Sequence, residues 1–254
     1  MIELNAVYVL IARDFKKFVR EKGRLISTFA RPLIWLFLVG GGMSRLVSPG
    51  MGLSYMQFIF PGILGMTILF SAIFSSISII WDKEFGLMKA ILVAPVSRLS
   101  IVIGKALSGT IISVIQAAVI LMLFPFLGIK LSLLSAVSAL AVSFLLAFSI
   151  SALGIIIASF LESMESFSAI MNFIVMPMFF LSGAMYPVKN LPEILKLISK
   201  LNPLTYGIDA LKHAIFPDSG IFDFTLPVDL SILIISSTAF VITAGLMFER
   251  KKSG

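Results

Sequence analysis

The sequence contains no cysteine and a single histidine, His213, among its 254 residues. Disulfide bonds, thiol chemistry and cysteine metal sites are therefore excluded. A metal site built from several histidines is excluded as well, and any Ser–His–Asp triad would have to use His213. We expect this histidine to be solvated at an interface, beside Lys212. The residues that usually carry catalysis are thus scarce in this chain.

Charge is scarce too, because Asp, Glu, Lys and Arg make up 13% of the residues while hydrophobic residues make up 59%. Soluble domains carry roughly 25% charged residues. So few polar side chains cannot cover a surface in water, which predicts a polytopic membrane protein. The formal net charge of +7 is explained by basic residues that border membrane segments, and no nucleic-acid binding is expected.

A nucleotide-binding phosphate loop is missing as well. Gly104-Lys105 resembles a fragment of that motif, but Ala106 follows the lysine and the pair opens an apolar run. No Asp or Glu occupies the middle of an apolar run, although gradient-coupled carriers commonly need one there. We expect no cofactor or metal in this chain, so the energy for any transport must come from another subunit.

Long apolar runs dominate what the sequence does contain. A membrane-spanning helix needs about 20 residues, and six runs approach or exceed that length. They predict an all-α membrane protein with a single transmembrane domain over 1–254. The predicted spans are residues 25–43, 54–80, 101–124, 131–160, 166–188 and 224–248.

Polar residues are rare within these spans. Polar side chains at membrane depth commonly mark a transport path, and small polar residues also pack helices closely. Three amide side chains are therefore candidates for either the pathway or helix packing: Gln57, Gln116 and Asn172.

The basic residues predict the orientation. An even number of spans places both termini on one side, and Lys and Arg fall mainly inside if that side is the cytoplasm. Residues 4–22 place Arg13, Lys16, Lys17 and Arg20 on one helical face and apolar residues on another. This pattern predicts an amphipathic helix that lies in the membrane interface.

Residues 188–223 form the largest predicted segment outside the membrane, on the external side. Two amphipathic helical patterns occur there, over residues 191–201 and 206–215, separated by Asn202-Pro203. Two such helices could line an exit from the membrane or rest on the headgroups as a cap, and the sequence leaves both open.

The most informative segment is residues 81–98, WDKEFGLMKAILVAPVSR, which is strongly charged and lies between two apolar runs. Its first nine residues include four charged ones: Asp82, Lys83, Glu84 and Lys89. It predicts a short amphipathic helix at the membrane surface. Gly86 permits a break after the span, and Pro95 ends the helix because the residue before a proline avoids the α region.

Two motifs give the chain a resemblance to the membrane subunits, or permeases, of type 2 ABC exporters. The first is residues 84–97 (EFGLMKAILVAPVS), although Lys89 replaces an acidic residue common in the family and Ala94 a Thr or Ser. The second is residues 177–187 (PMFFLSGAMYP), followed by Leu191-Pro192 and residues 202–211 (NPLTYGIDAL). The resemblance covers nearly the whole chain and is strongest to the drug-export, daunorubicin-type branch.

The resemblance implies a role for each segment. Residues 81–98 would contain a cytoplasmic coupling helix that docks on a separate ATPase, and residues 188–215, within the external segment 188–223, would form a re-entrant helical hairpin. Two ATPase copies would bind ATP and Mg, and a second permease copy would complete a homo- or heterodimer in the plasma or inner membrane. The chain itself would not be an enzyme. The implied ATPase-coupling residues are Asp82, Glu84, Phe85, Gly86, Lys89 and Pro95.

Two alternatives stay open beside this function. A stand-alone secondary transporter is disfavoured because the spans lack acidic residues at mid-depth. An intramembrane enzyme, such as a lipid-modifying hydrolase, is disfavoured because the chain has one histidine and no paired acids inside the spans. The motifs do not identify the substrate.

Overall fold

The computed structural model describes residues 3–44, 53–86 and 96–250, which form helices and turns without a strand. The predicted coupling residues Lys89 and Pro95 lie outside these ranges. The first half contains α1 (Leu4–Arg20), α2 (Lys22–Ile34), η1 (Trp35–Gly40), α3 (Gly41–Met43), α4 (Tyr55–Ser75), α5 (Ile77–Glu84), α7 (Arg98–Leu121) and η2 (Phe124–Leu127). The second half contains α8 (Leu133–Phe160), α9 (Met164–Ile170), η3 (Met171–Val175), α10 (Met176–Phe180), η4 (Val188–Asn190), α11 (Glu193–Leu201), α12 (Pro203–Ile215) and α13 (Leu226–Arg250).

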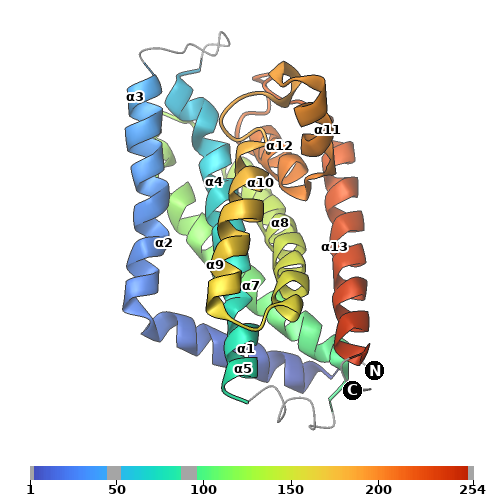
Figure 1. The fold of residues 1–254 in the computed structure, drawn as a ribbon. Coiled ribbons are helices and arrows are strands. Elements are labelled where there is room, and N and C mark those ends of the chain that lie inside the picture. The colour runs from blue at the N-terminus through green and yellow to red at the C-terminus, as the bar shows by residue number, and fades with distance from the viewer. Residues whose placement is uncertain (1–2, 45–52, 87–95, 251–254) are drawn as a thin grey trace.

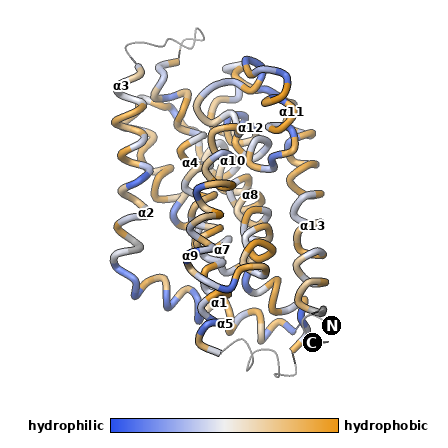
Figure 2. Tube along the Cα trace, viewed as in Figure 1, coloured by the Kyte–Doolittle hydropathy of each residue, from blue (hydrophilic) through white to orange (hydrophobic). Residues whose placement is uncertain are grey.

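Four helices among the described residues are long and apolar enough to cross a membrane. They are Tyr55–Glu84, Arg98–Leu121, Leu133–Phe160 and Leu226–Phe248. Figure 2 shows hydrophobic residues along these helices and hydrophilic residues mainly towards the two ends of the bundle. Four of the predicted spans are therefore present as long apolar helices, and the count of six stays a prediction.

The first and fifth predicted spans are helical, but their apolar helices are shorter, Phe29–Met43 and Met164–Phe180. In the first, Pro32 lies inside α2 and a π-helical turn follows at Trp35, as expected where proline removes a backbone hydrogen bond. The fifth was predicted to reach residue 188, but helix α10 ends at Phe180. Turns follow there, with Gly183 at a φ of 76°, a conformation that glycine adopts without strain.

Helix α8 lies at the centre of the fold and packs against α4, α7, α12 and α13. Small residues permit these close contacts. A Cβ atom on Gly109 of α7 would lie 2.6 Å from Oγ of Ser151 in α8, and one on Gly207 of α12 would clash with Leu146. Glycines of α7 and α12 thus let these helices pack closely on α8.

Helix α1 lies across one end of the bundle, roughly perpendicular to the long helices, whereas α11 and α12 lie at the opposite end (Figure 1). We call these the α1 end and the α11 end. The last turn of α13 also lies at the α1 end (Figure 1). Val7, Leu10 and Phe18 form the buried face of α1, and Leu10 packs on Gly104 of α7. Tyr8 and Val9 are exposed, as expected of a helix at a membrane interface.

Candidate functional site

Four charged side chains from three helices meet in what we call the ionic corner, at the α1 end. They are Arg13 and Asp14 of α1, Asp82 of α5 and Lys105 of α7. The Lys105 ammonium donates to Asp82 Oδ2 at 3.0 Å and to Asp14 Oδ2 at 3.1 Å. Arg13 Nη2 donates to the same Asp82 oxygen at 2.8 Å, and Ser78 Oγ accepts from Lys105 at 2.9 Å. The corner therefore connects α1, α5 and α7.

The charges of the ionic corner balance, with two cations and two carboxylates. The side chain of Lys105 is 4% exposed and that of Asp82 is 8% exposed. Burial by itself lowers the pKa of Arg13, but the hydrogen bond and charge of Asp82 and the charge of Asp14 raise it above its ordinary value. Since charged groups away from water are stable only when paired, these contacts hold the three helices in a fixed arrangement.

Helix α5 makes further contacts beside the corner. Lys83 Nζ donates to the carbonyl oxygens of Ala158, Ser159 and Leu161 at 2.7 to 2.9 Å. A cation there satisfies carbonyls at the C-terminal end of α8 and is favoured by the helix dipole. Lys17 of α1 lies 3.6 Å from the centroid of the Trp81 ring. Helix α5 is thus joined to α1, α7 and α8 before the chain enters the predicted coupling segment.

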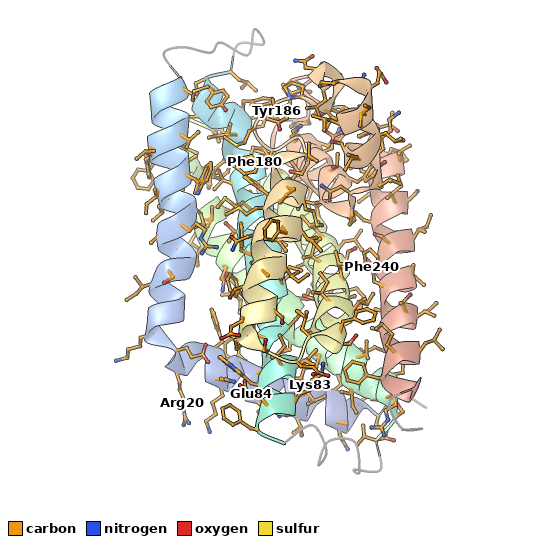
Figure 3. All side chains as sticks on the ribbon, in the orientation of Figure 1. Arg20, Lys83, Glu84, Phe180, Tyr186 and Phe240 are labelled. Carbon is orange, nitrogen blue, oxygen red and sulfur yellow. The ribbon has the colours of Figure 1, made fainter. Side chains whose placement is uncertain are left out.

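The described coupling residues divide into two groups. Asp82 is 5% exposed and its carboxylate lies inside the ionic corner. Glu84, Phe85 and Gly86 are exposed beyond the corner, with Phe85 74% exposed. Gly86 has a φ of 72°, and this left-handed residue follows the end of α5, as expected from the sequence. Figure 3 shows Lys83 and Glu84 at the α1 end and Tyr186 at the other.

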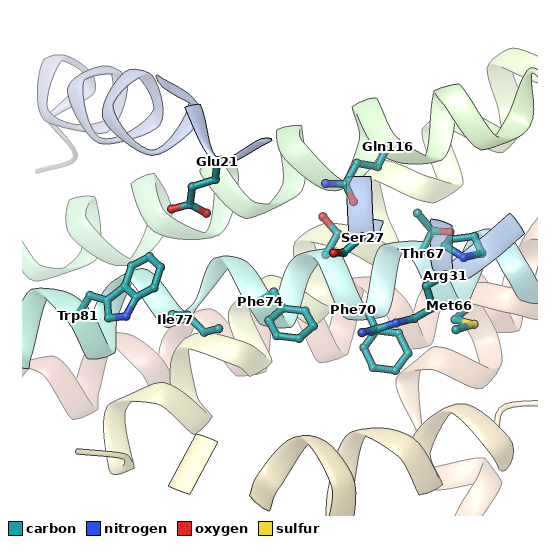
Figure 4. Close-up of a pocket in the computed structure, with 12 residues that line it drawn as sticks. Glu21, Ser27, Arg31, Met66, Thr67, Phe70, Phe74, Ile77, Trp81 and Gln116 are labelled. Carbon is teal, nitrogen blue, oxygen red and sulfur yellow. The ribbon is translucent and has the colours of Figure 1, made fainter. Parts of the chain in front are cut away.

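A cavity of about 350 Å³ opens beside α4 in the part of the bundle nearer the α1 end. Figure 4 shows it extending from Trp81 and Glu21 to Arg31 and Met66. Its wall is mainly apolar. The residues that line it are Glu21, Ser27, Arg31, Pro32, Met66, Thr67, Phe70, Ser71, Phe74, Ile77, Trp81 and Gln116.

The polar groups of this cavity are few and partly unpaired. The Arg31 guanidinium lies 4.6 Å from the centroid of the Phe70 ring and 5.9 Å from that of Phe74, a cation–π arrangement. Gln116 Oε1 and Ser71 Oγ are buried without a hydrogen-bond partner. Buried polar atoms normally have partners, so water or a ligand in the cavity would satisfy these two atoms.

The other two candidate pathway residues lie elsewhere. Gln57 forms a capping box with Ser54 at the start of α4, and its Nε2 donates to Leu127 O at 3.0 Å. Asn172 is exposed and its Nδ2 donates to Ser168 O in the preceding turn at 3.1 Å. Of the three amides, only Gln116 lines the cavity.

Sequence reasoning missed most of the residues that give these sites their charge. Lys105 was considered only as a fragment of a phosphate loop, and Arg31 was not considered as part of a site. A signal for Lys105 was available, since a charged residue inside a predicted span needs a partner at membrane depth. Asp82 and Asp14 are close enough only because α5 and α1 meet there, and no sequence spacing indicates that.

Comparison with known proteins places the whole chain among transport permeases. The family described as ABC-2 type transporter matches residues 5–216. The putative transport permease ycf38 of Cyanophora paradoxa is 34% identical over 227 residues, which cover 88% of this chain and 78% of that protein.

Two bacterial proteins are similar over most of their lengths. Nodulation protein J of Rhizobium leguminosarum bv. trifolii is 29% identical, covering 74% of this chain and 72% of that protein. The inner membrane transport permease YadH of Escherichia coli K12 is 25% identical, covering 94% and 93%. The likeness thus extends across the ionic corner, the cavity and the α11 end.

Proposed function

The chain belongs to the ABC-2 type transporter family, and on that premise we propose that this membrane permease is the translocating subunit of an ATP-driven exporter. In the proposal, two copies of a separate ATPase bind ATP and Mg, and a second permease, identical or not, completes the assembly. The α1 end faces the cytoplasm and the α11 end the outside of the plasma or inner membrane.

The ionic corner is the observation that supports coupling most directly. It joins α5 to α1 and α7 through buried charges, and Lys83 joins α5 to α8. Glu84 and Phe85 project from the same helix end. A displacement of residues 81–98 by a partner would therefore move four helices together, because packed elements transmit strain rather than absorb it.

Contact with the ATPase can be tested by exchanging one exposed charge. The permease and its ATPase are co-expressed, and both co-purification and ATP hydrolysis are measured for Glu84→Lys. We expect both to fall severalfold, because charge at an interface sets docking register. The matched control is Glu193→Lys, an exposed glutamate at the α11 end, which should retain both. Equal behaviour of the two variants would contradict the coupling role.

Orientation can be tested with cysteines, since the chain has none of its own. Lys16→Cys lies at the α1 end and Glu193→Cys at the α11 end, both at exposed positions. A membrane-impermeant maleimide should label Glu193→Cys in intact cells and Lys16→Cys only after permeabilisation. The reverse order would overturn the proposed orientation.

The cavity beside α4 is the candidate part of the translocation path in this chain. Ser71 lines it with an unpaired hydroxyl, whereas Ser113 of α7 is fully buried and bonds to Gly109 O. A small thiol reagent should therefore modify Ser71→Cys much faster than the matched Ser113→Cys. Similar rates would show that the cavity is closed to polar solutes.

A further inference from the structure

Five ionisable side chains lie together at the α11 end, remote from the ionic corner and the cavity. They form what we call the α11-end cluster: Asp209, Lys212 and His213 of α12, Asp223 of the following connector, and Asp229 in the first turn of α13. The four Asp and Lys residues are each less than 9% exposed by side chain, and the His213 side chain is 17% exposed. The expectation that His213 is solvated is therefore wrong.

Three of the five already make polar contacts within the chain. The Asp209 carboxylate accepts from the backbone N–H groups of Asp223 and Phe224 at 2.8 to 3.1 Å. Asp223 accepts from the N–H groups of Val188 and Lys189, both at 3.1 Å. Lys212 Nζ lies 3.5 Å from both Asp209 Oδ1 and Asp223 Oδ2. These contacts hold α12 against the segments before and after it.

Asp229 is different, because it is 0% exposed and neither of its carboxylate oxygens has a hydrogen-bond partner. His213 is one of its ionisable neighbours, with Nε2 lying 3.8 Å from Asp229 Oδ2. The His213 ring is stacked on the Phe222 ring, with 3.7 Å between the ring centroids, and its Nε2 is 3.0 Å from Phe224 O. A buried carboxyl group stays charged only when a cation or hydrogen-bond donor pairs with it, so the two unpartnered oxygens of Asp229 offer an open position for a cation.

The charges of the cluster lead to the same conclusion. Three carboxyl groups lie with one ammonium, Lys212, and one imidazole, so all three can be ionised together only if a further cation binds there. Asp209, His213 and Asp229 each offer one ligand atom, and these atoms lie within 4.8 Å of one another. One imidazole nitrogen and two carboxylate oxygens form a donor set suited to Zn²⁺ and related divalent transition metals.

We propose that Asp209, His213 and Asp229 bind a divalent transition-metal ion of the Zn²⁺ type. The ion would take the unpaired Asp229 carboxylate and the neutral Nε2 of His213 as ligands, in place of the contact between that nitrogen and Phe224 O. It would connect α12 directly to the first turn of α13. The site is structural and lies outside the proposed coupling machinery, so it does not depend on that proposal.

The test uses the full chain in detergent, stripped with a chelator and then titrated with Zn²⁺ by calorimetry. We expect about one Zn²⁺ per chain, and Co²⁺ should give the visible absorption of a bound ion at the same stoichiometry. His213→Gln and Asp229→Asn should each weaken binding by about tenfold or more. Asp218→Asn, a nearby exposed aspartate, is the matched control and should bind as the wild type does.

Several outcomes would overturn the proposal. A folded wild-type chain that binds no Zn²⁺ would show that Asp209, His213 and Asp229 do not form a metal site. Unchanged binding in a folded His213→Gln chain would place any bound Zn²⁺ elsewhere. Circular dichroism and gel filtration establish folding for each variant, and His213→Gln keeps the test decisive if Asp229→Asn does not fold.

Discussion

The ionic corner at the α1 end and the α11-end cluster both hold charged side chains away from solvent, but their charges balance differently. In the corner, Lys105 and Arg13 face Asp82 and Asp14 at 2.8 to 3.2 Å. In the cluster, the Lys212 ammonium lies 3.5 Å from the carboxylates of Asp209 and Asp223, and the carboxyl group of Asp229 has no hydrogen bond.

This difference in charge balance indicates that the two groups of buried charges have different roles. A balanced network has no affinity left for a ligand, and removing any member leaves another charge unpaired. An unbalanced network is incomplete without a cation, so its stability depends on what binds there. The corner is therefore suited to holding helices in register, and the cluster to binding an ion.

The largest expected effect is the loss of Lys105. Lys105→Met leaves Asp14 and Asp82 buried with only Arg13 to pair with, and should lower the free energy of unfolding by about 3–5 kcal/mol. Reversible denaturant unfolding in detergent, followed by circular dichroism, measures the change. Lys196→Met is the matched control, since Lys196 pairs with an exposed glutamate on α11 and such pairs contribute little. Equal losses in both variants would contradict the balanced network.

A bound ion should stabilise the cluster without help from the corner. At a free Zn²⁺ concentration about 100-fold above the dissociation constant, the wild type should gain about 2.7 kcal/mol in stability. Lys105→Met should show the same gain, because Lys105 lies at the other end of the bundle, whereas His213→Gln, which binds at least tenfold more weakly, should gain no more than about 1.4 kcal/mol. A gain that disappears in Lys105→Met would mean that the two ends are not independent.

The same substitution should have opposite effects at the two ends in metal-free protein. Asp82→Asn removes a paired charge and should destabilise the chain, whereas Asp229→Asn removes an unpaired one and should stabilise it by about 1 kcal/mol. Unfolding midpoints in the presence of a chelator measure both. If Asp229→Asn also lowers the midpoint, the Asp229 carboxyl group already makes a stabilising contact in the metal-free chain.

Much of the fold follows from the sequence because long apolar runs allow few structures. Residues that must satisfy every backbone hydrogen bond at membrane depth form helices, and four such helices appear close to where the runs predict them. The short amphipathic helices of residues 191–201 and 206–215 were predicted from the helical spacing of their apolar residues, and they correspond to α11 and α12. The end of the fifth predicted span was missed because the apolar run continues past Phe180, where α10 ends and turns that include the left-handed Gly183 begin.

The sites were less predictable, since they depend on which helices meet. Asp82 was expected among the exposed coupling residues, yet Lys105 reaches it from α7 and both are buried. His213 was expected in water, yet the connector brings Phe222 onto its ring. In both cases the residue type was visible in the sequence, but its partner came from a distant segment, and periodicity contains no information about such pairs.

The smallest effect on stability is expected just beyond the corner, at Phe85. This ring is 74% exposed, so Phe85→Ala removes almost no packing and should change the free energy of unfolding by no more than about 0.5 kcal/mol. If Phe85 contacts an ATPase, as proposed, hydrolysis by the co-purified complex should nevertheless fall, because exposed aromatic side chains are typical anchors of interfaces. Phe126→Ala, which removes a ring that is 82% exposed near the start of α8, is the matched control and should leave hydrolysis unchanged.

Loss of hydrolysis with unchanged stability would separate the exposed end of α5, which binds a partner, from the buried corner, which holds the helices. A loss of stability equal to that of Lys105→Met would instead make Phe85 part of the corner itself.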